Sequence, residues 1–201
     1  MDPARAVSRP AVAFDVPDQR TTSTLIAEND LTGADRNKIR AFLTAAYPGY
    51  AELWTQQDFW GGPPEHRLLL RDPSGRLVGH LGFARRLIEV DARAVRIAGI
   101  GAVAILPEMQ GRGIGRHLLA ELTAILRHDV AVEFGFLQCR DAVIGFYENC
   151  GFQRITQQVR SFDPNFRRWQ VDDAAAMILP ASATADSWPR HGLVDLMGMP
   201  W

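Results

Sequence analysis

Segment 103–119, VAILPEMQGRGIGRHLL, combines glycines, arginines and apolar residues in a pattern that suits ligand binding. An apolar β-like run ends at Pro107, a turn with three glycines follows, and apolar residues then recur at helical spacing. Glycine lets a backbone approach a ligand closely, and the N–H groups at a helix start favour an anion. Arg112 and Arg116 add positive charge one turn apart. This strand, turn and helix predict a phosphate site, and a glycine-rich turn without a ligand is the alternative.

The spacing of Gly111, Gly113 and Gly115 differs from the Rossmann fingerprint, and the Gly-Lys-Ser/Thr of a P-loop is absent. It resembles motif A of the GNAT acyl-CoA N-acyltransferases, Gln/Arg-x-x-Gly-x-Gly/Ala, beginning here at Gln110. A second GNAT motif matches residues 146–152, FYENCGF. The two motifs occur in the family order, and the resemblance covers roughly residues 22–179.

This resemblance implies an α/β (α+β) fold, the GNAT fold, in which a mixed central sheet is splayed between two parallel strands and carries helices on both faces. Acetyl-CoA is the implied co-substrate and would enter the gap between those strands. The strand before the turn would hold the pantetheine and the turn would hold the pyrophosphate. The implied cofactor-binding residues are Val103, Ala104, Ile105, Gln110, Gly111, Arg112, Gly113, Ile114, Gly115 and Arg116.

The resemblance also implies direct transfer, with Tyr147 as the general acid that protonates the departing thiolate. The alternative for Tyr147 is a tyrosine that closes a helix over the core. A backbone N–H near Ala104 could polarise the thioester carbonyl. We expect Cys139 to be a core residue and His80, beside Gly79, to be structural. The candidates for the general base are Asp58, Glu65, His80, Asp172, Asp173 and the carboxylate of Trp201.

Two families of amino-sugar acylating enzymes compete for the acceptor, and our main expectation is an aminoglycoside 2′-N-acetyltransferase that gives antibiotic resistance. The aminoglycoside 2′-N-acetyltransferases resemble the chain at Gly79-His80, at Arg85-Arg86 and in its final tryptophan. An acid expected on the fourth strand falls on Gly101, which favours a less cationic substrate such as kasugamycin over gentamicin. The substrate-binding residues expected from this reading are Asp58, Trp60, Glu65, Gln138, Asp172, Asp173 and Trp201.

The second family is the nodulation acyltransferase, which adds a fatty acyl chain to a chitin-oligosaccharide amine. It resembles the chain across Pro64-Glu65-His66-Arg67, at His80 and at Arg85-Arg86. The fuller glycine pattern of motif A favours acyl-CoA over an acyl-carrier protein as donor. Two other readings stay open, a non-catalytic acyl-CoA-binding module and a protein lysine acetyltransferase.

Composition bounds these readings. The 201 residues are 47% hydrophobic and 22% charged with a net charge of −1, which suits a globular domain and gives no basic field for nucleic acid. The sequence shows no membrane-length apolar run, no signal-peptide apolar region and no metal-ligand spacing. We therefore expect a cytoplasmic enzyme that requires no metal and acts on a small molecule, with a homodimer left open.

The pattern of apolar and polar residues predicts the strands and helices that carry the site. We expect a loose extension over residues 1–20 and a single domain over 21–201. Thr32 is the predicted N-cap of a helix, with Asp35 three residues on. Residues 47–64 are either a loop-like aromatic and acidic site wall or a short amphipathic helix. Strands are expected at 22–28, 66–71, 76–90, 95–105, 132–138, 152–162 and 174–179, and further helices at 113–127 and 142–149.

Overall fold

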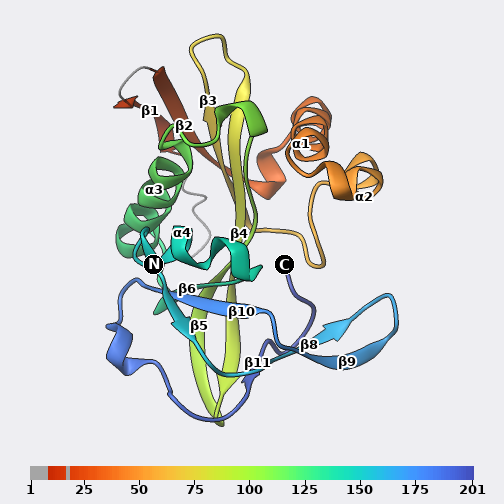
Figure 1. Ribbon diagram of the computed structural model, residues 1–201, viewed down its shortest axis with the longest axis vertical. Coiled ribbons are helices and arrows are strands. Elements are labelled where there is room, and N and C mark those ends of the chain that lie inside the picture. The colour runs from red at the N-terminus through yellow and green to blue at the C-terminus, as the bar shows by residue number, and fades with distance from the viewer. Residues whose placement is uncertain (1–8, 17–18) are drawn as a thin grey trace. The chain divides into compact units, whose positions relative to one another are not determined.

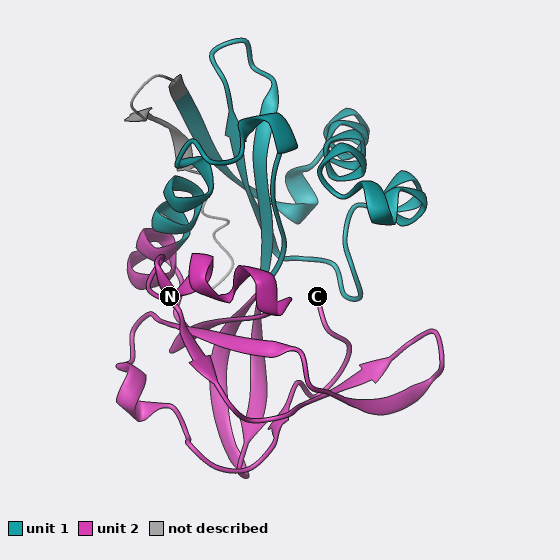
Figure 2. Ribbon diagram, in the orientation of Figure 1, with its two compact units in different colours: residues 1–83, 101–122 teal, residues 84–100, 123–201 magenta. Residues whose placement is uncertain are grey.

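The computed structural model describes residues 9–16 and 19–201, with residues 9–16 and 19–20 described by their backbone alone. The chain divides into two compact units (Figure 2). Unit 1 comprises residues 1–83 and 101–122, and unit 2 comprises residues 84–100 and 123–201. Strands β4 (Leu77–Val90) and β5 (Arg93–Ile105) and helix α3 (Ile114–His128) each contribute to both units.

Unit 1 is built on antiparallel strands that pair in the order of the chain (Figure 1). They are β1 (Arg9–Val16), β2 (Gln19–Ala27), β3 (His66–Arg71) and the first part of β4. We expected a loose extension over residues 1–20, but residues 9–16 form a strand that pairs with β2. Residues 1–8 and 17–18 lie outside the described residues. Strand β3 has the predicted bounds, and four of its six residues are buried.

Helix α1 (Gly33–Ala46) begins as the sequence predicted. The Thr32 side chain accepts a hydrogen bond from the Asp35 N–H, and the Asp35 carboxylate accepts one from the Thr32 N–H, which forms a complete capping box. The helix buries Ile39, Phe42 and Leu43 on one face. A 3-10 turn (Pro48–Tyr50) and helix α2 (Ala51–Gln56) follow, so the short-helix alternative for this segment is confirmed.

The two faces of the unit 1 sheet are covered by different helices. Strand alternation puts His80 on one face, where its ring centroid lies 6.2 Å from that of Phe42 in α1. Ser23 pairs with Leu70, the neighbour of the residue that pairs with His80, so its side chain lies on the opposite face. The Ser23 hydroxyl donates to Glu121 of α3 at 3.4 Å. Helices thus lie on both faces, as expected.

Unit 2 contains the parallel part of the sheet. Residues 97–99 of β5 pair in parallel with residues 134–136 of β6 (Phe134–Cys139), and the recorded pairing ends there. Strand β10 (Ala175–Pro180) pairs antiparallel with β6 on its other side, and β7 (Gln153–Ile155) pairs with β10. The sheet is therefore mixed. The parallel strands β5 and β6 separate after three paired residues, which is the splay that the sequence predicted.

The remaining elements of unit 2 correct one prediction. The strand expected over 152–162 is two strands, β7 and β8 (Val159–Asp163), and β8 forms a hairpin with β9 (Arg168–Asp172), which was not predicted. Strand β11 (Val194–Asp195) pairs with both β4 and β8 and ties the tail to the sheet. Helix α4 (Ile144–Glu148) is shorter than predicted because a 3-10 turn (Asp141–Val143) precedes it.

The core of unit 2 lies on one face of these strands. Trp188 packs edge-on against Phe134 at 5.1 Å and stacked against Phe136 at 6.1 Å, and Trp201 packs against the same cluster. On the other face of β6, a Cβ at Gly135 would contact Leu126 of α3. The tail from residue 181 is therefore part of the fold.

Candidate active site

The glycine turn between β5 and α3 in unit 1 has the backbone that the sequence predicted. Gly111 and Gly113 have φ of 75° and 82°, in the left-handed region that favours glycine. A Cβ built on either would meet no other atom within 4 Å. Helix α3 begins at Ile114, so the N–H groups of its first turn follow the glycines directly. Arg112 and Arg116 are exposed. The turn has the backbone and charge of an anion-binding loop.

The exposed side chain of Gln110 makes a hydrogen bond that connects this turn to the preceding strand. Its Nε2 donates to the carbonyl oxygen of Ile105 at 3.2 Å and so joins the turn to the end of β5. Ala104 is buried, whereas Val103 and Ile105 are half-buried. The predicted pantetheine strand and pyrophosphate turn are thus one continuous hydrogen-bonded segment.

Strand β5 is distorted immediately before that segment. Ala102 has φ of 49°, a left-handed conformation that costs an ordinary residue about 1–2 kcal/mol. Its carbonyl oxygen lies 2.9 Å from Nδ1 of His80, and the next carbonyl, that of Val103, accepts a hydrogen bond from the Tyr47 hydroxyl. A left-handed residue within a strand is typical of a bulge.

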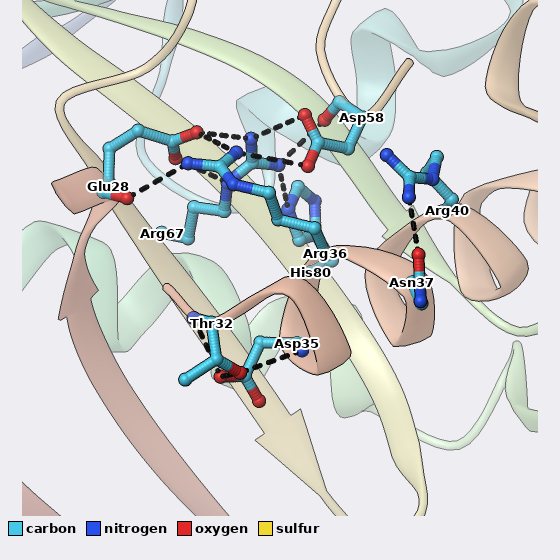
Figure 3. Close-up of polar contacts among 9 residues, drawn as sticks. All are labelled: Glu28, Thr32, Asp35, Arg36, Asn37, Arg40, Asp58, Arg67 and His80. Carbon is cyan, nitrogen blue, oxygen red and sulfur yellow. Dashed lines mark hydrogen bonds and ion pairs between the residues drawn. The ribbon is translucent and has the colours of Figure 1, made fainter. Parts of the chain in front are cut away.

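A buried cluster of charged side chains surrounds Arg67, whose guanidinium contacts the His80 ring (Figure 3). Arg67 is 0% exposed, and its guanidinium binds the Glu28 carboxylate through Nε at 2.7 Å and the Asp58 carboxylate through Nη2 at 3.2 Å. Arg36 also binds both carboxylates, at 2.6 Å and 3.2 Å. Burial alone would raise the pKa of Glu28, but hydrogen bonds from Arg67 and Arg36 outweigh it and lower this pKa.

This cluster bears on two of the candidate bases, Asp58 and His80. Asp58 is 3% exposed and both of its carboxylate oxygens are bound by arginines, which argues against its predicted roles as a base and an acceptor contact. His80 is fully buried, and burial together with the charge of Arg67 lowers its pKa to about 3. His80 is therefore neutral at pH 7 and is no general base, which agrees with the structural role expected for it.

The predicted site wall retains its aromatic surface. Trp60 and Tyr50 are 46% and 56% exposed and meet edge-on, with ring centroids 6.2 Å apart. Glu65, at the start of β3, is half-buried, and its N–H donates to the Phe83 carbonyl at 2.8 Å. Unit 1 therefore carries Trp60, Glu65 and the complete predicted cofactor segment.

Unit 2 carries the predicted general acid. Tyr147 lies in α4, is 7% exposed, and contacts Phe146 and Phe152 edge-on at 5.2 Å and 5.3 Å. The Phe152 N–H donates to the Tyr147 carbonyl and ends the helix turn. Burial raises the pKa of Cys139, and the nearby Asp141 charge adds to this effect. A thiol held protonated is a poor nucleophile, although Cys139 is half-buried and not the core residue that the sequence predicted.

Gln138 and Trp201 lie on the same face of unit 2. Gln138 is two residues after Phe136 on β6, and the Phe136 ring meets the Trp201 ring edge-on at 6.0 Å. The Gln138 Nε2 is buried and makes no hydrogen bond in the described part of the chain. A buried donor without a partner costs about 1–3 kcal/mol. An oxygen of a bound molecule would satisfy it.

Asp172 and Asp173 are exposed at the end of the β8–β9 hairpin. The Asp172 carboxylate accepts the Ala174 N–H at 2.8 Å, and that of Asp173 accepts Nε2 of Gln158 at 2.8 Å. Both therefore stabilise the path from β9 into β10, and their predicted contact with an acceptor stays a prediction.

Two residues with structural consequences for the site were missed. Tyr47, the C-cap of α1, binds the carbonyl of Val103, and nothing in its sequence position signals this. Arg86 donates to the carbonyls of Leu196 and Met199 at 3.1 Å and 3.3 Å and lies 5.5 Å from the centroid of the Trp201 ring. The resemblance of both families to the chain at Arg85-Arg86 was the available signal for Arg86.

The described residues contain no cluster of three or more histidine, cysteine, aspartate or glutamate side chains suited to a metal ion. Within the same residues, none of the helices combines the length and apolar character that a membrane crossing requires.

Solved structures establish the fold. The chain resembles the GNAT family N-acetyltransferase YhbS from Escherichia coli, solved in complex with CoA, with a TM-score of 0.55 and 18% identity over 87% of this chain and 89% of that one. It also resembles a GNAT family acetyltransferase from Brucella melitensis in complex with acetyl-CoA, with a TM-score of 0.52 and 18% identity over 89% and 95% of the two chains. The predicted GNAT fold is confirmed.

Sequence relatives establish the family. The nodulation protein A of Rhizobium tropici is 29% identical over 185 residues, which is 85% of this chain and 93% of the relative. That of Azorhizobium caulinodans is 27% identical over 179 residues, 81% and 77% of the two chains. The model of the family Nodulation protein A (NodA) matches residues 19–200. These matches favour the second of the two resemblances over the aminoglycoside enzymes, and the chain belongs to the NodA family.

Proposed function

We propose that this protein transfers an acyl group from a coenzyme A thioester to the amine of a glucosamine oligosaccharide. The observation that carries the proposal is the match of the nodulation protein A family to residues 19–200. The resemblance to the nodulation acyltransferase implies the acceptor class, and the glycine turn supplies an independent argument for the donor.

The glycine turn before α3 supports coenzyme A as the carrier of the acyl group. Gly111 and Gly113 hold left-handed backbone with open space on the side where a Cβ would project. A pyrophosphate beside them would meet the first N–H groups of α3, the helix dipole and the exposed Arg112 and Arg116. In this proposal the backbone of Val103, Ala104 and Ile105 binds the pantetheine arm. The donor is then acyl-CoA.

The reaction forms one C–N bond and breaks one C–S bond. The neutral amine attacks the thioester carbonyl, the Ala104 N–H stabilises the oxyanion, and the C–S electron pair leaves on sulfur. Tyr147 gives its proton to this thiolate as general acid. The attacking nitrogen loses its proton to a base or to water, and the carboxylates of Glu65, Asp172 and Asp173 remain candidates.

The acceptor side favours a sugar with few charges. Trp60 and Tyr50 offer exposed aromatic surface on which pyranose rings could pack. The buried Gln138 amide could donate to a sugar oxygen. Asp58, which would hold a spectator amine of an aminoglycoside, is committed to two arginines. A glucosamine oligosaccharide with one free amine therefore fits better than gentamicin.

The test is an acceptor panel assayed by release of free CoA. Purified protein is given acetyl-CoA or a long-chain acyl-CoA with a glucosamine oligosaccharide, kasugamycin, gentamicin or a lysine peptide. We expect turnover with the oligosaccharide to exceed that with every other acceptor at least about tenfold. Equal or greater turnover with gentamicin or kasugamycin would overturn the acceptor assignment. Binding of acyl-CoA without turnover on any acceptor would favour a non-catalytic module.

A further inference from the structure

The backbone distortion at Ala102 is held by side chains from two separate elements of unit 1. The first is His80 of β4, whose Nδ1 lies 2.9 Å from the Ala102 carbonyl oxygen. The second is Tyr47 at the end of α1, whose hydroxyl donates to the Val103 carbonyl. Two successive carbonyls of one strand are therefore bound by side chains.

The protonation of His80 is fixed by its second nitrogen. Nε2 lies 3.2 Å from Nη1 of Arg67. A guanidinium has only donors, so Nε2 must be the acceptor and the ring carries its single proton on Nδ1. That proton is donated to the Ala102 carbonyl. Arg67 thus keeps His80 neutral and in the one tautomer that can bind the strand.

Arg67 is itself held on every side. Its five N–H donors all have acceptors, as Figure 3 shows in part. Glu28 takes Nε and Nη2, the carbonyl and carboxylate of Asp58 take Nη1 and Nη2, and His80 takes the remaining position on Nη1. A fully bonded and fully buried guanidinium has a single orientation, and so therefore does the imidazole ring.

Peptide geometry transmits this orientation to the predicted oxyanion donor. A trans peptide unit is planar, so fixing a carbonyl also fixes the following N–H, which points the opposite way. The bond from His80 to the Ala102 carbonyl therefore sets the direction of the Val103 N–H. The bond from Tyr47 to the Val103 carbonyl sets the direction of the Ala104 N–H.

We infer that Tyr47 and His80 are positioning residues for acyl transfer, which hold the peptide units of residues 102–104 so that the Val103 and Ala104 N–H groups are fixed before the thioester arrives. The buried cluster of Glu28, Asp58 and Arg67 keeps His80 in the required tautomer. This inference rests on the proposed acyl transfer. Donors that are already in position stabilise an oxyanion without reorganisation during the reaction. The buried ion pairs would therefore contribute to catalysis by keeping these N–H groups in position.

The main test is Tyr47→Phe, which removes the hydroxyl and keeps the ring that stacks on Trp54 at 5.7 Å. We expect kcat with acyl-CoA to fall at least about tenfold, while KM for the acceptor changes less than about twofold. The amide nitrogen resonance of Ala104 should shift in the variant without any substrate. A variant with wild-type kcat and an unmoved Ala104 resonance would overturn the inference.

A matched pair at His80 separates positioning from stability. His80→Asn keeps an N–H near the place of Nδ1, whereas His80→Leu keeps bulk and has no donor. Both variants leave Arg67 without its imidazole acceptor, so we expect both to unfold at lower denaturant concentration. Only His80→Leu should lose kcat, at least about tenfold below His80→Asn. Equal kcat in the two variants would show that His80 acts only through stability.

The resonance readout also keeps this inference separate from the proposed function. If the wild type transfers no acyl group but Tyr47→Phe and His80→Leu still move the Val103 and Ala104 resonances, the proposed function fails and the positioning contact stands. If the wild type transfers acyl groups and neither variant moves these resonances, the inference fails and the proposed function stands.

Discussion

The indole ring of Trp201 packs directly on the backbone of Gly99. A Cβ at Gly99 would fall 2.3 Å from Cε2 of the indole, closer than any real contact. The indole N–H also donates to the Ile100 carbonyl at 3.1 Å. Gly99 is the last residue of β5 recorded as paired with β6. The last residue of the chain therefore lies beside the point where the two parallel strands part.

Gly99→Ala should expel this ring. The indole is rigid and cannot yield to an added methyl group, and overpacking of this kind costs about 1–3 kcal/mol. We expect the free energy of unfolding in urea to fall by that amount and amide exchange at residues 199–201 to rise. Gly49→Ala is the control, because a Cβ there meets nothing within 4 Å. Equal stability of the two variants would contradict the packing.

Gly113→Glu should weaken acyl-CoA binding. The carboxylate would add bulk and negative charge beside the predicted pyrophosphate, and we expect the Kd for acetyl-CoA by calorimetry to rise at least about tenfold, or about 1.4 kcal/mol. Gly113→Ala separates the charge from the strain, because both variants place a Cβ at φ of 82°. If Gly113→Glu folds and binds acetyl-CoA as tightly as the wild type, the phosphate-turn assignment is wrong.

Tyr147→Phe should lower turnover and leave donor binding intact. General-acid catalysis typically contributes about 10²–10⁴-fold, so we expect kcat to fall at least about 10²-fold with little change in the Kd for acetyl-CoA. The ring would keep its contacts with Phe146 and Phe152, so the fold should persist. Wild-type kcat would show that Tyr147 covers the core or that water supplies the proton.

Stability should depend on pH through His80. Its pKa is about 3 in the folded chain against an ordinary value of 6.5, because burial and Arg67 disfavour the charged ring. Between these values the unfolded chain binds a proton that the folded chain does not. The contribution of His80 to the free energy of unfolding is therefore complete above about pH 6.5, and it is lost as the pH falls towards 3. Glu28, with its lowered pKa, acts in the same direction at lower pH.

The measurement is urea unfolding at pH 7 and at pH 5. At about 1.4 kcal/mol per pKa unit, the His80 contribution lost by pH 5 is about 2 kcal/mol. We expect His80→Asn to reduce the difference between the two pH values by that amount. His191→Asn, at an exposed position, should keep the wild-type difference. An unchanged difference in His80→Asn would mean that His80 titrates normally in the folded chain.

The sequence predicted most helices and strands because caps, apolar residues and glycines mark each of them locally. The capping box at Thr32, the apolar run of leucines in β3 and the left-handed glycines before α3 depend on neighbours in sequence alone. The β8–β9 hairpin was missed because its outward residues, Trp169 and Val171, are apolar but 45% and 51% exposed. An apolar run on a solvent-facing hairpin resembles the continuation of a buried strand.

The site was predictable only where its function depends on the backbone. The turn from Gln110 to Gly115 follows from residue types, whereas the partners of Asp58 do not. Asp58 and Arg67 are 9 residues apart in the chain, and their ion pair arises only when β3 forms. The sequence therefore could not show that the Asp58 carboxylate is buried and ion-paired.

The proposed acyl transfer is tested most directly by identifying the product. The protein is incubated with a long-chain acyl-CoA and a glucosamine oligosaccharide bearing one free amine, and the products are analysed by mass spectrometry while free CoA thiol is titrated. The account predicts an oligosaccharide heavier by one acyl group, amide-linked at the amine, with one thiol released for each. Hydrolysis of the thioester without acylated sugar, or acylation at a hydroxyl, would contradict it.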